Sequence, residues 1–154
     1  MKVFNLYNDE LGNSNAREGW NFRAAKVGEH IGGELIGAGL YEAQPGNKVW
    51  PYHTHHANEE WLLVLRGRPT LRTPEGERQL DEGDVVCFLR GNAGAHQVWN
   101  GSDSPIRVLM LSTLVTPDIV EYLDTGKVGA RSVAGERIMF GRPGPTLDYW
   151  EGEE

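Results

Sequence analysis

The sequence predicts an all-β fold, a sandwich or a closed barrel built from short strands. Eight apolar segments of four to ten residues follow one another, and turn signals rich in glycine, proline, asparagine and aspartate separate them. The chain of 154 residues contains 20 glycines and 8 prolines, a composition typical of many tight turns. No stretch between the segments shows a convincing amphipathic helix, so we expect strands joined by hairpin-length connections.

The predicted strands follow from the apolar segments and the turns that end them. They lie at residues 34–43, 49–55, 60–66, 69–73, 77–80, 84–89, 96–99 and 106–112, and a ninth is expected in the tail that begins ERIMFG. The strand at 60–66 is apolar on both faces, so we expect terminal arms or a partner subunit to cover its second face. The segment TPDIVEYL is expected to form one helical turn, with Thr116 as N-cap and Pro117 at the first helical position.

The length of the chain predicts one domain with a core of its own. Residues 1–19 are polar and are expected to form an N-terminal arm, and residues 20–115 the barrel. Residues 116–154 are expected to form a C-terminal extension that packs on the barrel or on a partner subunit. Tyr149 and Trp150 near its end are poor choices for a free tail.

Charge and composition argue against nucleic acid and membranes as binding partners. A formal net charge of −7 argues against nucleic acid, because the chain has no excess of cations to neutralise phosphates. No apolar run approaches the length of a membrane span, and the first residues contain no apolar export signal. The one cysteine, Cys87, lies in the apolar run DVVCFL, where we expect it to be buried. These features predict a cytoplasmic protein with a small-molecule partner.

The stretch PYHTHHANEEWLLVLRG carries an unusual density of titratable side chains. His53 and His55 point to the same side of a strand because they are two residues apart. Glu59 and Glu60 begin the next strand, and one of these carboxylates falls beside the imidazoles if the strands pair. His96 opens a strand about forty residues later. Imidazole and carboxylate ligands suit Mn, Fe, Co, Ni or Zn, and the lack of thiolates argues against a structural zinc site.

The spacing around these residues follows a two-part motif. The first part is a glycine, then H-x-H, three or four residues, a glutamate, six residues and a glycine. In this sequence Gly46 is followed by His53 and His55, then four residues later by Glu60, and after six more by Gly67. Six residues separate Gly46 from His53 where the pattern has five.

The second part of the motif is a glycine, five residues, P-x-G, two residues, a histidine, three residues and an asparagine. It is matched by Gly83, then Leu89 in place of the proline, then Gly91, His96 and Asn100. The loop before His96 is two residues longer than the pattern, but the distance from His96 to Asn100 is kept. Together the two parts resemble the cupin superfamily, and the whole chain is similar to small single-domain bacterial cupins.

The resemblance implies a double-stranded β-helix, a small jelly-roll barrel with a metal inside its mouth. It implies four metal ligands, which are carried over as His53, His55, Glu60 and His96, with one divalent Fe, Mn, Ni or Zn ion. Glu60 is preferred by its distance to Gly67, and Glu59 stays open as the alternative. The neighbouring His56 is interpreted as supporting the ligands or as solvated. A homodimer is also expected, since a dimer interface is one way to cover the second apolar face of the strand at 60–66.

Four protein ligands on an octahedral metal leave two positions for a substrate. The chain is therefore expected to be a metalloenzyme, of isomerase, lyase or oxygenase type, that acts on a small polar metabolite such as a sugar or sugar phosphate. Arg66 and Arg72 are candidates to hold a carboxylate or phosphate, although surface charges on an acidic protein would look the same. Two alternatives stay open: a non-catalytic metal-containing binding module, and a metal-free scaffold with a polar core.

Overall fold

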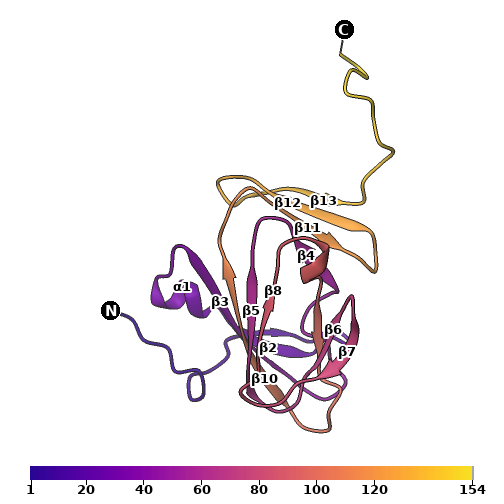
Figure 1. Cartoon of the computed structure of the whole chain (residues 1–154). Coiled ribbons are helices and arrows are strands. Elements are labelled where there is room, and N and C mark those ends of the chain that lie inside the picture. Colours follow the sequence, from indigo (N-terminus) through magenta and orange to yellow (C-terminus); the bar gives the residue numbers. More distant parts are fainter. Residues whose placement is uncertain (154) are drawn as a thin grey trace.

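The computed structural model describes residues 1–153, apart from the side chains of Asn13 and Ser14, and antiparallel strands dominate it (Figure 1). The largest sheet has the strand order β1-β2-β3-β10-β5-β8. Its strands are β1 (Asn13–Asn15), β2 (Phe22–Ala25), β3 (Ile36–Ala43), β10 (Ile106–Thr113), β5 (Glu60–Arg66) and β8 (Val85–Phe88). The two long strands β3 and β10 pair over eight residues at the centre of this sheet.

Two smaller sheets form the opposite wall. One has the order β7-β6-β9 and the other β13-β12-β11-β4. Their strands are β4 (His53–His55), β6 (Thr70–Thr73), β7 (Gly76–Gln79), β9 (Gln97–Trp99), β11 (Asp118–Tyr122), β12 (Lys127–Arg131) and β13 (Arg137–Gly141). A bridge between His53 and His96 joins them. One short helix, α1 (Val27–Ile31), and one 3-10 turn, η1 (Asn92–Gly94), complete the described elements.

The core lies between these walls because strand alternation turns one apolar set inward from each. Leu62 and Val64 of β5 and Val108 of β10 meet Leu71 of β6 and Val98 of β9 in one buried cluster. This cluster fills the interior of the barrel. Strand β4, which carries His53 and His55, lies at one end of the barrel together with β11–β13 (Figure 1).

The second face of β5 is covered in part by the N-terminal arm. Leu63 and Leu65 pack in a cluster with Phe4, Leu6 and Leu11. Trp61, on the same face, is still 46% exposed. The expected second layer over this strand is therefore present from the chain's own arm, although it stops short of the tryptophan.

The all-β class predicted from the sequence is confirmed. Each of the eight expected strands overlaps one observed strand, and the ninth corresponds to β13. The helical turn expected at 116–123 is wrong: this segment is β11, which pairs with β4 on one side and β12 on the other. In this strand Asp118 and Val120 are buried and Ile119 is exposed, and β4 and β12 supply hydrogen-bond partners on its two edges, which a single helical turn lacks.

One expectation about a single residue differs from the structure, and another is not tested by it. Cys87 is exposed, because β8 is the edge strand of its sheet and turns this side chain outward. Tyr149 and Trp150 contact each other at 4.7 Å between ring centroids, and both are exposed. The tail that carries them extends away from the barrel (Figure 1), so their packing against a partner subunit stays a prediction.

Asn100, the last residue of the second motif, ties together the loop that follows β9. The side-chain amide is fully buried; it donates to the carbonyl oxygens of Ala43 and Ser104 at 2.9 and 2.8 Å. Its oxygen accepts from the backbone N–H and the hydroxyl of Ser102. An asparagine at this position therefore fixes the turn between β9 and β10, which keeps His96 and β10 in place.

Asn100→Ala should lower the free energy of unfolding by about 2–4 kcal/mol, because it leaves buried carbonyl groups without donors. Urea unfolding followed by tryptophan fluorescence measures this loss. Asn8→Ala is the matched control, since Asn8 is exposed and makes no side-chain hydrogen bond within the described residues. Equal stability of the two variants would contradict the role given to Asn100.

Candidate metal centre

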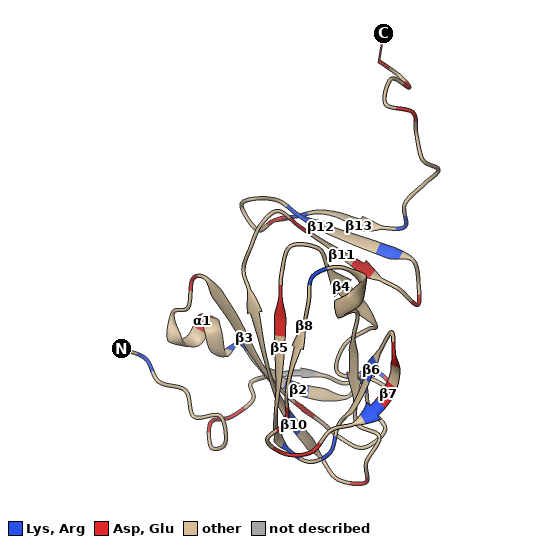
Figure 2. Ribbon diagram, viewed as in Figure 1, with Lys and Arg blue, Asp and Glu red and all other residues tan. Residues whose placement is uncertain are grey.

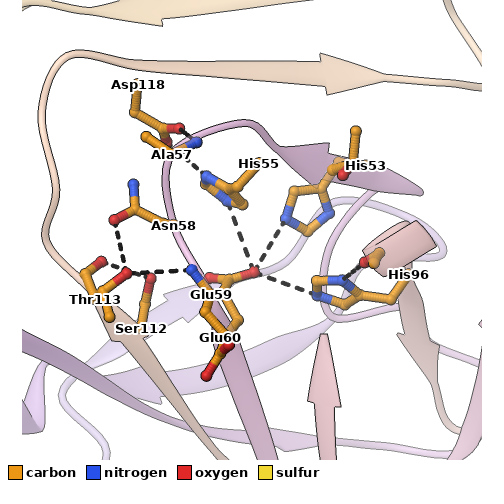
Figure 3. Close-up of polar contacts among 12 residues, drawn as sticks. His53, His55, Ala57, Asn58, Glu59, Glu60, His96, Ser112, Thr113 and Asp118 are labelled. Carbon is orange, nitrogen blue, oxygen red and sulfur yellow. Dashed lines mark hydrogen bonds and ion pairs between the residues drawn. The ribbon is translucent and has the colours of Figure 1, made fainter. Parts of the chain in front are cut away.

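Three histidines and one glutamate meet at the open end of the barrel (Figure 3). His53 and His55 come from β4 and face the same side, as their spacing predicts. His96 lies directly across the backbone from His53, because the two residues exchange N–H···O hydrogen bonds of 3.2 and 2.9 Å. Glu60 begins β5, where its neighbours are Phe88 and Ser112 on the flanking strands.

Each imidazole is oriented by a hydrogen bond at Nδ1. His53 Nδ1 lies 2.8 Å from the Pro51 carbonyl oxygen, and His96 Nδ1 lies 2.9 Å from the Gly94 carbonyl oxygen. His55 Nδ1 lies 2.6 Å from a carboxylate oxygen of Asp118. All three partners are acceptors, so Nδ1 carries the proton and Nε2 presents a lone pair.

The three Nε2 atoms surround one oxygen of Glu60. Glu60 Oε2 lies 3.8 Å from His53 Nε2, 3.7 Å from His55 Nε2 and 3.4 Å from His96 Nε2. Within the described residues, Glu60 Oε2 and His96 Nε2 are buried and have no hydrogen-bond partner. Lone pairs of four acceptors thus converge on one point, an arrangement that a cation stabilises and that otherwise leaves buried polar atoms unsatisfied.

The geometry shows which of the candidate ligands lie together. One ligand atom from each of His53, Glu60 and His96 lies within 4.8 Å of the others, and His55 joins through its contact with Glu60. Glu59 points elsewhere: its carboxylate accepts from the indole N–H of Trp61 at 2.8 Å on the outer surface. Of the two glutamates that the sequence offers, the structure therefore brings Glu60 to the histidines.

Burial favours the neutral imidazole at two of the three histidines, His96 and His53. It lowers the pKa of His96 to about 3, with help from the nearby His53, and it lowers the pKa of His53 to about 4, with help from His55. Burial also raises the pKa of the Glu60 carboxyl group. For His55 burial acts in the same downward direction, but the hydrogen bond to Asp118 and the nearby carboxylates of Glu60 and Asp118 together outweigh it, and the pKa is raised.

The ring of His96 is also fixed by stacking. Phe88 of β8 lies parallel to it, with 3.7 Å between centroids and an interplanar angle of 5°. The loop before His96 contains η1, which positions the backbone of His96. In η1, Gly94 lies so close to Leu89 that an added Cβ would be 1.6 Å from the Leu89 carbonyl oxygen. The two extra residues of this loop relative to the motif are thus accommodated without displacing His96.

Asp118 is a site residue that the sequence reasoning missed. Its second oxygen accepts from the backbone N–H of Ala57, so the carboxylate fastens the turn after β4 as well as the ring of His55. Burial raises its pKa, but the hydrogen bonds from His55 and Ala57 outweigh this and lower it. No local pattern in the sequence singles out Asp118, because its contact with His55 depends on the pairing of β11 with β4.

The other sequence candidates lie away from this centre. His56 points outward and pairs with Glu121 at 2.6 Å. Arg66 is at the far end of β5, about 20 Å from Glu60 at the rise of an extended strand. Arg72 is held by two hydrogen bonds to Asp124 and lies over the Tyr52 ring. The structure does not bring either arginine to the histidines.

A cavity of about 210 Å³ opens beside His53 and His55. Its wall is formed by β11, β12 and β13, and it includes two arginines that the sequence reasoning did not select, Arg131 and Arg137. A second cavity of about 270 Å³ reaches Glu60 from the side of β3 and α1. The centre is therefore accessible to small molecules.

Comparisons with known proteins point to one family. Residues 39–112 match the family model of the Cupin domain, and this range contains all four residues of the centre. No curated protein matches the chain.

Several solved structures share the fold. A protein from Acidithiobacillus ferrooxidans, provisionally described as a sugar phosphate isomerase, is 26% identical with a TM-score of 0.75, and the match covers 84% of this chain and 83% of that one. A cupin-superfamily sugar phosphate isomerase from Silicibacter pomeroyi is 27% identical with a TM-score of 0.73, over 86% and 82%. A cupin-like protein from Thermotoga maritima shows the fold alone, at 21% identity and a TM-score of 0.59, over 72% and 85%.

The depressed pKa of His96 predicts that metal-free protein is less stable against unfolding at low pH. Below pH 6.5 the unfolded chain protonates this ring, whereas the folded chain does so only near pH 3. The free energy of unfolding therefore decreases as the pH is lowered from 6.5 toward 3. Between pH 7 and pH 5, chelator-treated wild type should lose on the order of 1–2 kcal/mol more than His96→Asn. Urea unfolding of both proteins at the two pH values measures the difference, and parallel pH profiles would contradict it.

Proposed function

Because the chain carries a cupin-superfamily domain, we propose that it is a metal-dependent enzyme of isomerase type that acts on a small sugar or sugar phosphate. The metal would be one divalent transition ion held by His53, His55, Glu60 and His96. The observation that carries this proposal is the convergence of three imidazole lone pairs on the orphaned oxygen Glu60 Oε2.

The separations of the donor atoms fit a shared ion. Ligands that each lie about 2.1 Å from a metal can be no more than about 4.2 Å apart. The distances from Glu60 Oε2 to the three Nε2 atoms, 3.4–3.8 Å, satisfy this limit. The same atoms are too far apart to be hydrogen-bonded to one another. Imidazole and carboxylate donors suit Fe, Mn, Ni or Zn.

The chain's own residues prepare this centre for binding. The Nδ1 hydrogen bonds to Pro51, Gly94 and Asp118 hold each ring in one tautomer, so no reorientation is needed when an ion enters. When bound, the ion supplies Lewis-acid polarisation of a substrate carbonyl or hydroxyl group. The wall of β11–β13 confines the substrate beside His53 and His55 and limits the water around it.

The isomerase assignment is supported by two of the similar structures, which are described as sugar phosphate isomerases and are 26–27% identical over more than four fifths of this chain. A small polar substrate also agrees with the size and lining of the cavity, which combines arginine, histidine and aromatic side chains. A panel of aldose and ketose phosphates, assayed for interconversion by proton NMR, tests the reaction type. Binding of these sugars without turnover would favour the non-catalytic binding module instead.

Purified, untagged protein should contain about one transition metal per chain, measured by plasma mass spectrometry. His53→Ala/His96→Ala should contain none, because it removes two of the four proposed donors. Arg66→Gln serves as the control with an intact centre. A wild type that takes up no metal after reconstitution would overturn the proposed function.

Asp118→Asn should weaken metal binding by about 10–100-fold, because it removes the carboxylate that orients His55. Competition with a chromogenic chelator measures the affinity. The matched control is Glu121→Gln, which alters a histidine–carboxylate pair of the same 2.6 Å length between the same two regions but outside the centre. Equal losses in the two variants would contradict the orienting role of Asp118.

A further inference from the structure

We propose that Arg131 and Arg137 form an anion-binding subsite in the cavity beside His53 and His55, and that the ligand of this site carries a carboxylate or phosphate group. This inference deepens the proposed function and rests on it for the role of the metal. The subsite itself is argued from residues of β12 and β13, which lie outside the family match at 39–112.

The register of the four-stranded sheet places these arginines on the histidine side. Val120 pairs with His55 and with Gly129, and Gly129 pairs with Phe140. This row of residues crosses the sheet from the proposed metal ligand to the outermost strand.

The neighbouring row starts at Asp118, which pairs with Arg131, and Arg131 pairs with Arg137 across a register shift. Residues two apart on one strand share a face, so Arg131 lies on the same face as Gly129. Both arginines line the cavity together with His53 and His55.

These two cations are not neutralised by the protein. Four other arginines of the described residues form ion pairs with carboxylates: Arg23, Arg68, Arg72 and Arg107. No ion pair within the described residues involves Arg131 or Arg137. Asp118 stands next to Arg131 in register, but its oxygens are taken by His55 and the Ala57 N–H.

The charge of the cavity is opposite to that of the whole chain. The protein has a formal net charge of −7, yet no carboxylate lines this cavity. Figure 2 shows basic residues along the β12–β13 hairpin that covers this end of the barrel. A concentration of positive charge in a recess of an acidic protein attracts anions of small size.

The floor of the cavity is formed in part by Gly129 and Phe140. Gly129 is buried at the centre of β12, and a Cβ there would lie 3.3 Å from the Phe140 ring. The guanidinium of Arg137 lies over the same ring, 4.9 Å from its centroid. Stacking on an aromatic face holds the guanidinium while its N–H groups stay free for bidentate contacts to carboxylate or phosphate oxygens.

The cavity on the other side of Glu60 does not offer this chemistry. It is lined mainly by glycines and apolar residues of β3 and α1, and its one basic residue, Lys26, is paired with Glu29 at 2.8 Å. An anionic ligand is therefore expected on the β12–β13 side, with its anion on the arginines and a second polar group directed toward the histidines. The volume of about 210 Å³ favours a small metabolite, because drug-sized ligands occupy about 300–1,000 Å³.

The test is isothermal titration calorimetry with three probes of one carbon skeleton: glycerol 3-phosphate, glycerate and glycerol. Each is titrated into metal-loaded and chelator-treated wild type, Arg131→Gln and Arg137→Gln. Arg66→Gln is the matched control, since this arginine lies at the opposite end of β5. Far-UV circular dichroism confirms that all variants are folded.

At least one anionic probe should bind wild type at least about 10-fold more tightly than glycerol, and each cavity variant should lose about 10-fold or more of that affinity. Arg66→Gln should bind as wild type does. Preference for glycerol 3-phosphate assigns a phosphate ligand, and preference for glycerate a carboxylate. Equal binding of all three probes, or equal affinity in wild type and both cavity variants, would overturn the subsite.

The two proposals fail in different ways. A wild type without metal that still shows arginine-dependent anion binding would overturn the metalloenzyme and leave the subsite standing. A metal-loaded protein that binds the anions no better than glycerol would leave the metal centre and remove the subsite. The chelator-treated titrations separate these cases, because neither arginine is a proposed metal ligand.

Discussion

The arrangement of the barrel's open end depends on the meeting of four hydrogen-bond acceptors, each with a lone pair, at one point. Three imidazole nitrogens face a buried oxygen of Glu60, and each ring is prevented from turning a proton toward that oxygen by a hydrogen bond at its other nitrogen. Such a site is unfavourable for the polypeptide alone, because buried acceptors without donors carry a desolvation cost. Its persistence must be supported by the surrounding structure, and the stacked Phe88, the His53–His96 backbone bridge and the Asp118 carboxylate provide that support.

Much of this arrangement is predictable from local sequence. The strand positions follow from apolar alternation and turn residues, and the pairing of His53 with His55 on one face follows from the two-residue period of a strand. The motif spacing favours Glu60 over Glu59, and the structure places the two carboxylates on opposite sides of the sheet. These predictions succeed because they depend on residues close in sequence, whose relative orientation the backbone geometry determines.

The remaining parts depend on pairing between distant segments. The segment at 116–123 contains a plausible N-cap and a proline at the first helical position, and it forms a strand because β4 and β12 offer hydrogen-bonding edges on both sides. Without that pairing, nothing in the sequence places Asp118 beside His55, which lies 63 residues earlier. The choice of Arg66 as a ligand-binding residue had the same weakness: it extended the face of the strand that begins at Glu60, but a strand carries its later residues away from the site.

The residues that the sequence predicts are the proposed metal ligands, whereas the residues that it does not predict are those proposed to orient a ligand ring or to bind the substrate. The four proposed ligands all lie inside the region that matches the Cupin domain, whereas Asp118, Arg131 and Arg137 lie beyond it. A barrel that supplies a metal and two open positions is compatible with many reactions. The segment after residue 112 adds a wall to one side of that centre, through a sheet in which β11 pairs with β4, β12 with β11, and β13 with β12. Selection among substrates is therefore expected to depend on the β12–β13 hairpin, since its side chains can change without disturbing the residues proposed to hold the ion.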